Sequence, residues 1–320
     1  MSKHRMISMI EEYLAYRRSM GFKISDDKAG AELRGFGRYA EQIGHHGSVT
    51  TDMAVQWAKH TRNSTPIYAA RRLDLIRGFA QYRALFDPNT EVPPKGILGP
   101  SQYPRKAPYI YSDDEIRALL QVAKTVHPKN GLRPKTYVTI LALLACSGLR
   151  VSEALALTDA DVNMQDGLLK INCTKFKKSR LVPLHPSSLH ALSEYRNFRN
   201  DYLQSQLLGA FFVNEDGTRL HYHNMKHQFN SFRCKLGWTE DGRTRTPRIH
   251  DLRHTFAVKC LQRWYEEGAD VDQKILTLAT YLGHVNVTKT YWYLTGVPEL
   301  MTIIGKRFEK YSHIQSGGDA

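Results

Sequence analysis

Apolar residues in the first 86 positions recur every three or four residues, the spacing that places them on one face of a helix. The pattern predicts four helices: the first ends at Gly21, the second covers about residues 26–43, the third starts at residues 50–52, and the fourth starts at Thr65 and Pro66. Threonine followed by proline favours a helix start, because threonine caps the free N–H groups and proline fits the first turn. We therefore expect residues 1–86 to form an N-terminal helical domain.

The fourth predicted helix combines an apolar stripe with basic residues. The stripe consists of large apolar and aromatic side chains, Tyr68, Leu75, Phe79, Tyr82 and Phe86. Four arginines flank it, Arg71, Arg72, Arg77 and Arg83. Such a face is either merely solvated or contacts the phosphate groups of a nucleic acid. The sequence leaves both interpretations open.

Residues 87–108 break the helical pattern. They contain six prolines and two glycines, and no periodic spacing of apolar residues survives. Prolines stiffen a chain, so we expect an extended linker that joins the helical domain to a second domain over residues 109–320. A segment of this length could pass around a duplex, and the two domains would then form a clamp around DNA.

Helical patterns return in the second domain, together with strand patterns. Ser112 and Glu115 match a capping box, and the apolar residues 137–145 before Gly148 predict a buried central helix. Strands are predicted at residues 168–173 and 179–184, with a possible third at 211–213. Further helices are predicted over residues 224–236, 250–264, 270–282 and 299–308, whereas residues 288–294 can be helical or extended. The predicted fold class is mainly α with a small β-sheet, and the second domain is mixed α/β.

The composition points to a polyanionic partner. A net charge of +14 and a pI near 9.6 favour nucleic acid as that partner. The chain has no apolar run long enough to span a membrane and no signal-peptide core, so we expect a cytoplasmic protein that associates with the nucleoid when it binds DNA. Its scattered cysteines form no Cys-x-x-Cys pair, which argues against zinc and for reduced core thiols. They are Cys146, Cys173, Cys234 and Cys260.

Several residues of the second domain are suited to breaking a phosphodiester without a metal ion. This reaction needs a nucleophile, cations that neutralise the transition state, and a proton for the leaving oxygen. Arginine offers a permanently charged planar fork, lysine and histidine can pass protons, and tyrosine can attack when cations stabilise its phenolate. The candidates are Arg150, Lys175, His250, Arg253, His284, and either Tyr291 or Tyr293.

Each candidate also has an ordinary structural interpretation, as a hairpin lysine, a helix-capping histidine, a surface arginine or a core aromatic residue. His250 and Arg253 share a helix face because they lie three positions apart. His284 follows a glycine at a predicted helix end, and Arg150 lies at a tight junction between two helices. No single residue is decisive, and the combination carries the hypothesis.

Four segments resemble, in the same order, the motifs of the tyrosine recombinases, the lambda-integrase-like site-specific recombinases. They are SGLRVSEAL (147–155), TKFKKSRLVPL (174–184), HDLRHTFA (250–257) and YLGHVNVTKTYWY (281–293). The resemblance covers roughly residues 110–295. The N-terminal helices and the linker fit the family's core-binding domain in position and character.

The resemblance implies a role for each matching residue. Arg150 and Arg253 would clamp the scissile phosphate, and Glu153 would buttress the site. His250 and His284 would hydrogen-bond the phosphate and assist proton transfer.

The nucleophile and the general acid are implied in the same way. In the family's pattern the nucleophile lies nine residues after the histidine of the Leu-Gly-His segment, which selects Tyr293 over Tyr291. Tyr293 would form a 3′-phosphotyrosyl bond, and Lys175 would protonate the leaving 5′-oxygen. The register of the hairpin is open, so Lys177 or Lys178 could replace Lys175 and could otherwise contact DNA.

The resemblance further implies recombination of double-stranded DNA sites by a homotetramer through a Holliday junction, without cofactor or metal and with related recombinases or accessory proteins as possible partners. The interval between His254 and His284 is longer than in compact members by roughly two helical turns, which favours a mobile element. Residues 299–308 would dock onto a neighbouring protomer or pack on their own domain. Two alternatives remain, a type IB topoisomerase-like DNA relaxase and a non-catalytic DNA-binding regulator.

Overall fold

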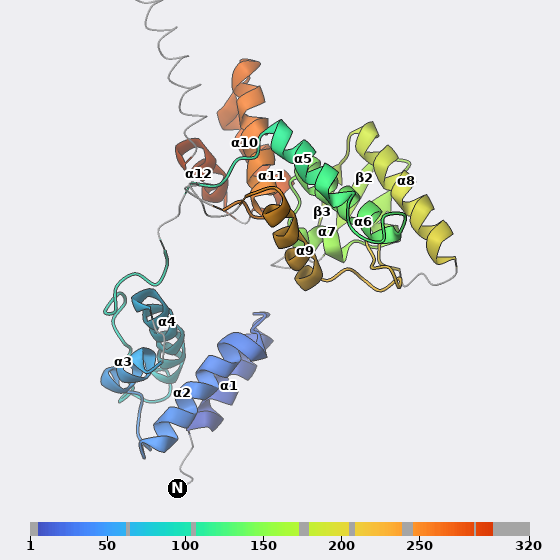
Figure 1. Cartoon of the computed structure of the whole chain (residues 1–320). Coiled ribbons are helices and arrows are strands. Elements are labelled where there is room, and N and C mark those ends of the chain that lie inside the picture. The colour runs from blue at the N-terminus through green and yellow to red at the C-terminus, as the bar shows by residue number, and fades with distance from the viewer. Residues whose placement is uncertain are drawn as a thin grey trace, which may run out of the picture. The chain divides into compact units, whose positions relative to one another are not determined.

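The computed structural model describes residues 6–61, 65–103, 107–172, 179–204, 209–238, 246–284 and 286–296. The chain divides into two compact units, Met1–Arg105 and Lys106–Ala320, and each has its own apolar core (Figure 1). Among the described residues, no helix combines the length and the apolar character that a membrane span requires. The terminal helix predicted over residues 299–308 lies outside the described residues.

The first unit is helical, as its apolar periodicity predicts. It consists of α1 (Met6–Ser19), a π-helical turn (Asp26–Gly30) that leads directly into α2 (Ala31–Gln42), α3 (Thr51–Lys59) and α4 (Pro66–Arg83). The predicted threonine caps are present, because the side chains of Thr50 and Thr65 accept hydrogen bonds from the first turns of α3 and α4. Phe36, Trp57 and Phe79 lie in the shared core of these helices.

Helix α4 differs from the predicted stripe. Its buried face is offset and contains Leu73, Ile76 and Phe79, whereas Tyr68 and Phe86 are exposed. Tyr68 and Phe86 extend the apolar pattern of the sequence beyond the part of α4 that the neighbouring helices cover.

Arg72 is a component of the core and not of a DNA-contacting surface. Its side chain is only 7% exposed, and its guanidinium carbon lies 3.7 Å from the centre of the Trp57 ring. An ion pair of 3.1 Å to Glu32 neutralises the charge. The prediction that Arg72 contacts phosphate is therefore wrong, whereas Arg71 is exposed and Arg77 and Arg83 are half-buried.

The first part of the proline-rich segment packs against the first unit. The amide of Glu91 donates to the carbonyl of Val49, and the Glu91 carboxylate accepts from the amide of Thr51. Thr90 is buried, and Leu98 contacts the apolar core. Residues up to Leu98 are therefore held by contacts that the proline content alone does not reveal.

The second unit surrounds the predicted central helix. It contains α5 (Asp113–Ala123), α6 (Leu132–Ser147), α7 (Val151–Ala156), α8 (Pro186–Leu203), α9 (Tyr222–Lys235), α10 (Asp251–Glu266), α11 (Val271–Leu282) and α12 (Thr288–Gly296). Helix α6 is buried between α5, α8 and α10, and the capping box of Ser112 and Glu115 starts α5 as predicted. Residues 288–294, for which two conformations were open, are helical. The fold class, mainly α with a small sheet, is confirmed.

The sheet is an antiparallel meander of β1 (Val162–Asn163), β2 (Leu168–Ile171) and β3 (Arg180–Pro183). Leu169 lies opposite Val162 on one side and Val182 on the other, and all three are buried. The two strands of the predicted hairpin are confirmed, but the third strand was placed wrongly. Residues 211–213 make only isolated bridges, because Phe211 and Phe212 are both buried in the helical core.

The cysteines only partly follow the prediction of core thiols. Cys146 and Cys234 are exposed and Cys260 is half-buried, while Cys173 lies outside the described residues. Both exposed cysteines lie on helices whose opposite faces are buried, so apolar neighbours in the sequence are a poor guide to the burial of a single position.

We predict that Arg72→Ala lowers the free energy of unfolding by about 2 kcal/mol, because it removes the stacking on Trp57 and the ion pair with Glu32, which keeps only the hydrogen bond from Tyr68 among its described contacts. Arg71→Ala, at the neighbouring exposed position of the same helix, is the matched control and should change the stability by less than about 0.5 kcal/mol. Urea unfolding followed by fluorescence measures both. Equal effects of the two substitutions would contradict the assignment of Arg72 to the core.

Candidate active site

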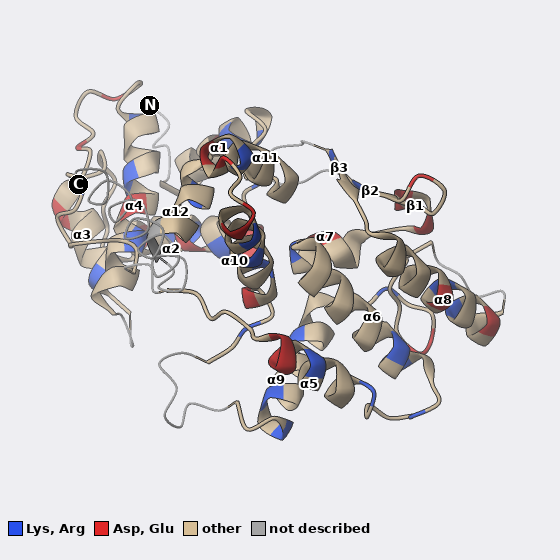
Figure 2. Cartoon of the chain, turned by 90° about the horizontal axis from the view of Figure 1, so that it is seen from above, with Lys and Arg blue, Asp and Glu red and all other residues tan. Residues whose placement is uncertain are grey.

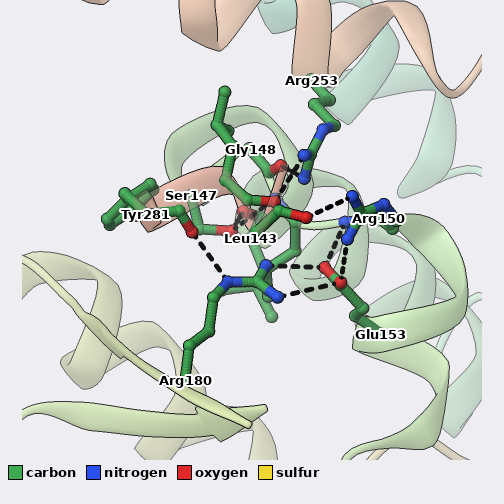
Figure 3. Close-up of polar contacts among 11 residues, drawn as sticks. Leu143, Ser147, Gly148, Arg150, Glu153, Arg180, Arg253 and Tyr281 are labelled. Carbon is green, nitrogen blue, oxygen red and sulfur yellow. Dashed lines mark hydrogen bonds and ion pairs between the residues drawn. The ribbon is translucent and has the colours of Figure 1, made fainter. Parts of the chain in front are cut away.

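The predicted site residues come together where four segments of the second unit meet. These are the junction between α6 and α7, the start of β3, the first turns of α10, and the C-terminal end of α11 (Figure 3). Helix α12 follows α11 after a short connection and packs with α10 and α11 in a small apolar core. The site therefore lies between this core and the main core around α6.

Two glycines let the helix ends approach each other. Gly148 ends α6 with φ +60°, and a Cβ atom there would lie 2.4 Å from the Phe256 ring. Gly283 ends α11 with φ +65°, and a Cβ atom there would lie 2.8 Å from the Arg180 guanidinium. Residues with a side chain rarely adopt these angles, so both the turn and the close contact require glycine.

Arg253 joins the two helix ends. It is 2% exposed, and its guanidinium donates to the carbonyl of Gly148 at 2.8 Å and to that of Leu282 at 2.5 Å. Carbonyls at helix C-termini carry partial negative charge and stabilise a cation. Burial, and then the charge of Arg150, lower the pKa of Arg253 to about 10, so the group remains protonated at pH 7.

Arg150 is fixed at the start of α7 by two partners. Its guanidinium donates to Glu153 at 2.6 Å and to the carbonyl of Gly283 at 2.8 Å. Its side chain keeps 32% of its surface exposed, unlike that of Arg253. The two bonds use two of the five guanidinium N–H groups, which allows Arg150 to bind an anion at its exposed side.

Arg180 is a site residue that sequence reasoning missed. It is the first residue of β3. Its guanidinium donates hydrogen bonds to both carboxylate oxygens of Glu153, at 3.0 and 2.8 Å, and to the carbonyl of Tyr281 at 2.7 Å (Figure 3). The sequence offered one indication of this role, a basic residue at the start of a predicted strand. That the Arg180 side chain points toward Glu153 depends on tertiary packing, which the sequence alone does not reveal.

Glu153 supplies the negative charge of this cluster. Burial alone would raise its pKa, but hydrogen bonds from Arg180 and from the Arg150 amide outweigh burial and hold the pKa at about 2. The carboxylate is therefore ionised throughout the physiological range. It links α7 to β3 by binding Arg150 and Arg180 at once.

The two predicted histidines are neutral at pH 7. Burial, followed by the charges of Arg253 and Arg150, lowers the pKa of His284 to about 3, and its Nδ1 lies 2.7 Å from the Thr290 hydroxyl. Partial desolvation of the ring and the nearby arginines lower the pKa of His250 to about 4, although its side chain is still exposed. Both rings can therefore exchange hydrogen bonds with a ligand without adding charge.

The two candidate tyrosines occupy different environments. Tyr293 is 2% exposed, and its hydroxyl lies 2.8 Å from Nδ1 of His254, one residue after Arg253. Tyr291 is 39% exposed. Only Tyr293 therefore has a described hydrogen bond to the helix that carries His250 and Arg253.

A cavity of about 780 Å³ opens beside Arg150 and His250. Its lining includes exposed polar residues of α9, among them Lys226 and Asn230, and also Arg233 and Arg248. Figure 2 shows basic positions along both α9 and α10. The cavity is thus a cationic surface adjoining the arginine cluster, suited to a phosphate-bearing ligand.

The structure brings together Arg150, Glu153, His250, Arg253, His284 and Tyr293, although not every pair is in direct contact. Lys175, Lys177 and Lys178 lie outside the described residues. Within the described ranges, no group of three or more His, Cys, Asp or Glu residues is arranged to hold a metal ion.

We predict that Glu153→Gln flattens the dependence of stability on pH. The pKa of Glu153 is depressed in the folded state, so its contribution is present above the unfolded pKa near 4.5 and is lost as pH falls toward about 2. The wild type should lose about 3 kcal/mol more unfolding free energy than the variant over this window. Urea unfolding between pH 6 and pH 2.5 provides the measurement. The same substitution at the exposed Glu194 is the control, and an equal flattening there would rule out the assignment.

Comparisons with known proteins extend these observations. The model of the phage integrase family matches residues 110–297. The putative integrase/recombinase y4rB of Sinorhizobium fredii (strain NBRC 101917 / NGR234) is 38% identical over 305 residues, covering 94% of this chain and 96% of the relative. The tyrosine recombinase XerC of Chlamydia muridarum (strain MoPn / Nigg) is 31% identical over 223 residues, which are 70% of this chain and 65% of XerC.

Among solved structures, the Tn1549 transposon integrase in complex with a circular intermediate DNA aligns with a TM-score of 0.61 at 18% identity, covering 89% of this chain and 94% of that one. At this identity the likeness indicates a shared fold. The family match and the relatives confirm what the four motifs indicated: the chain belongs to the phage integrase family of tyrosine recombinases.

Proposed function

We propose that this protein cleaves and rejoins double-stranded DNA at specific sites through a 3′-phosphotyrosyl bond formed by Tyr293. The observation that carries the proposal is the convergence of Arg150 and Arg253 on the C-terminal carbonyls of α11, the helix that precedes the segment bearing Tyr293. This arrangement holds two permanent cations close to a buried phenol. In phosphoryl transfer without a metal ion, two such cations can neutralise the charge that develops on the phosphate while the phenol attacks it.

The two arginines have complementary parts in the proposed reaction. Arg253, buried and bound to two carbonyls, forms the fixed base of the phosphate site. Arg150, with a third of its side chain exposed, receives the second non-bridging oxygen. Both guanidiniums gain most when the phosphorane carries its additional negative charge, so they lower the barrier and do not merely bind the substrate.

The remaining steps rest on the imidazoles and the hairpin. The neutral rings of His250 and His284 donate hydrogen bonds to the phosphate. Lys175 protonates the leaving 5′-oxygen, and Lys177 or Lys178 is the alternative in the same hairpin. The phosphotyrosyl bond conserves the energy of the broken bond, and a 5′-hydroxyl of a partner strand then attacks it.

The biological reaction that we propose is site-specific recombination for a mobile element. Four protomers on two DNA sites would exchange strands through a Holliday junction. The integrase and recombinase names of the relatives support this choice over a relaxase or a regulator without activity. Joining two marked DNA sites in vitro would support recombination, whereas relaxation of supercoils without joining would favour the relaxase.

We propose that DNA binds at the cavity beside Arg150. Lys226 and Asn230 of α9 line it, and Tyr222 continues the same face one turn earlier. The Tn1549 transposon integrase, which has a related fold, is in complex with a circular intermediate DNA, and this supports the proposed partner. The first unit would contribute Arg71, Arg77 and Arg83 to the proposed clamp around the duplex.

We predict that a nicked suicide duplex traps a covalent protein–DNA adduct that forms in EDTA. Tyr293→Phe should abolish the adduct, because the ring remains and only the attacking oxygen is lost. Tyr291→Phe is the matched control and should retain it. Denaturing gels with labelled DNA measure both, and an adduct that depends on Tyr291 would refute the assignment of the nucleophile.

A second prediction concerns the cavity. Lys226→Gln should weaken DNA binding severalfold and reduce the slope of log affinity against log salt by about 1, as expected for one lost phosphate contact. Lys235→Gln is the control, since Lys235 is on the same helix, nine residues further and half a turn around it. Fluorescence anisotropy across salt concentrations distinguishes them. Unchanged slopes in both variants would exclude α9 as a phosphate-contacting helix.

A further inference from the structure

His254 makes a direct contact with the atom that the proposed function identifies as the nucleophile. Its Nδ1 lies 2.8 Å from the hydroxyl oxygen of Tyr293, and the two rings are 5.5 Å apart in an edge-to-face arrangement. The rings of Trp292 and His250 also pack against the His254 ring, each in an edge-to-face arrangement. The imidazole is thus held on several sides and directed at one oxygen.

Helical spacing explains this placement. His250 is the N-cap of α10 and has helical backbone angles, so it shares a face with His254 four residues later, and the two ring centres are 4.8 Å apart. Arg253 points to the helix ends of α6 and α11 instead. The sequence therefore provides two histidines toward the site, of which the first faces the cavity and the second faces the phenol.

From this geometry we propose that His254 is a catalytic residue that accepts the proton of Tyr293 when the phenol attacks phosphorus. The proposal rests on the proposed function, because it requires Tyr293 to be the nucleophile. The arginines and a protonated lysine cannot take up this proton, whereas a neutral imidazole nitrogen has a lone pair for it. Of the three neutral imidazoles, His254 has its Nδ1 at the Tyr293 hydroxyl, while Nδ1 of His284 contacts Thr290. A ring nitrogen 2.8 Å from the attacking oxygen is within the distance that general base catalysis requires, and in the tautomer with its proton on Nε2 this nitrogen accepts from the Tyr293 hydroxyl.

The proposed step balances in both directions. During cleavage the bond between Tyr293 oxygen and its proton breaks, the oxygen–phosphorus bond forms, and the bond from phosphorus to the 5′-oxygen breaks. His254 holds the tyrosine proton while the hairpin lysine gives one to the 5′-oxygen. During rejoining the lysine takes back a proton from the attacking 5′-hydroxyl, and His254 returns its proton to the departing tyrosine.

Burial and the charges around His254 keep its ring neutral, and they also make it a weak base while no anion is bound. Burial, and then the neighbouring His250, Arg248 and Arg253, lower the pKa of His254 to about 3. The ring is therefore neutral at pH 7 in the absence of DNA. A bound phosphodiester brings negative charge beside the same arginines, which offsets their repulsion and makes the imidazole a stronger base in the complex.

The test is single-turnover cleavage of a nicked suicide duplex, with DNA affinity and thermal unfolding measured for every variant. His254→Gln moves the polar group away from the position of Nδ1 and should slow adduct formation about 100- to 1000-fold. His254→Asn places an amide oxygen close to that position and retains a hydrogen bond without a base. It should cleave faster than His254→Gln but remain well below the wild type.

A phenol of lower pKa separates proton transfer from a structural role. Replacing Tyr293 by a fluorotyrosine lowers the pKa of the phenol, so its proton is lost more easily. The replacement should therefore accelerate adduct formation by His254→Gln and His254→Asn about tenfold or more, while it changes the rate of the wild type little. A purely structural histidine gives no such selective rescue. The absence of rescue in both variants, or cleavage by His254→Gln within about threefold of the wild type, overturns the proposal.

The same adduct assay tests the proposed function independently of the role of His254. If the wild type forms no adduct, or Tyr293→Phe retains it, the proposed function fails. If the wild type forms an adduct that requires Tyr293 but His254 is dispensable, only the role of His254 fails. Because His254→Asn preserves polarity and approximate size, it keeps the test valid should His254→Gln unfold.

Discussion

Mutual repulsion among three guanidinium groups is the constraint around which the site is built. Arg150, Arg180 and Arg253 lie close enough for their charges to act on one another. One buried carboxylate, Glu153, and the terminal carbonyls of α6 and α11 hold them together. Helix ends are effective for this purpose because their carbonyls lack partners within the helix. Compensation by one full charge and several partial charges leaves a net positive site, which is suited to an anionic ligand.

The same cations determine the state of the other groups. His250, His254 and His284 are all neutral at pH 7, because the loss of solvent around each ring and the arginine charges disfavour a further positive charge. The site thus separates its tasks: arginines supply permanent charge, and imidazoles supply hydrogen bonds. Tyr293 lies at the boundary between the two groups, in contact with His254 and under the electrostatic influence of Arg253.

Local patterns predicted much of this arrangement. The caps at Thr50, Thr65 and Ser112 and the glycine ends at Gly148 and Gly283 depend on adjacent residues, and the structure contains them all. Features that depend on distant partners were missed. Arg72 resembles any surface arginine until Trp57 is placed beneath it, and Arg180 acquires its function from Glu153, 27 residues away. Phe211 and Phe212 suggest a strand but are buried among helices, and α8 was not anticipated.

The C-terminal end of α11 has a mechanical consequence. Three successive carbonyls there, those of Tyr281, Leu282 and Gly283, each bind a different arginine: Arg180, Arg253 and Arg150. His284 follows immediately. A shift of this one turn would break one hydrogen bond of each arginine at the same time, while Arg150 and Arg180 would remain bound to Glu153 and Arg253 to the Gly148 carbonyl. The position of this single turn therefore acts on all three cations at once.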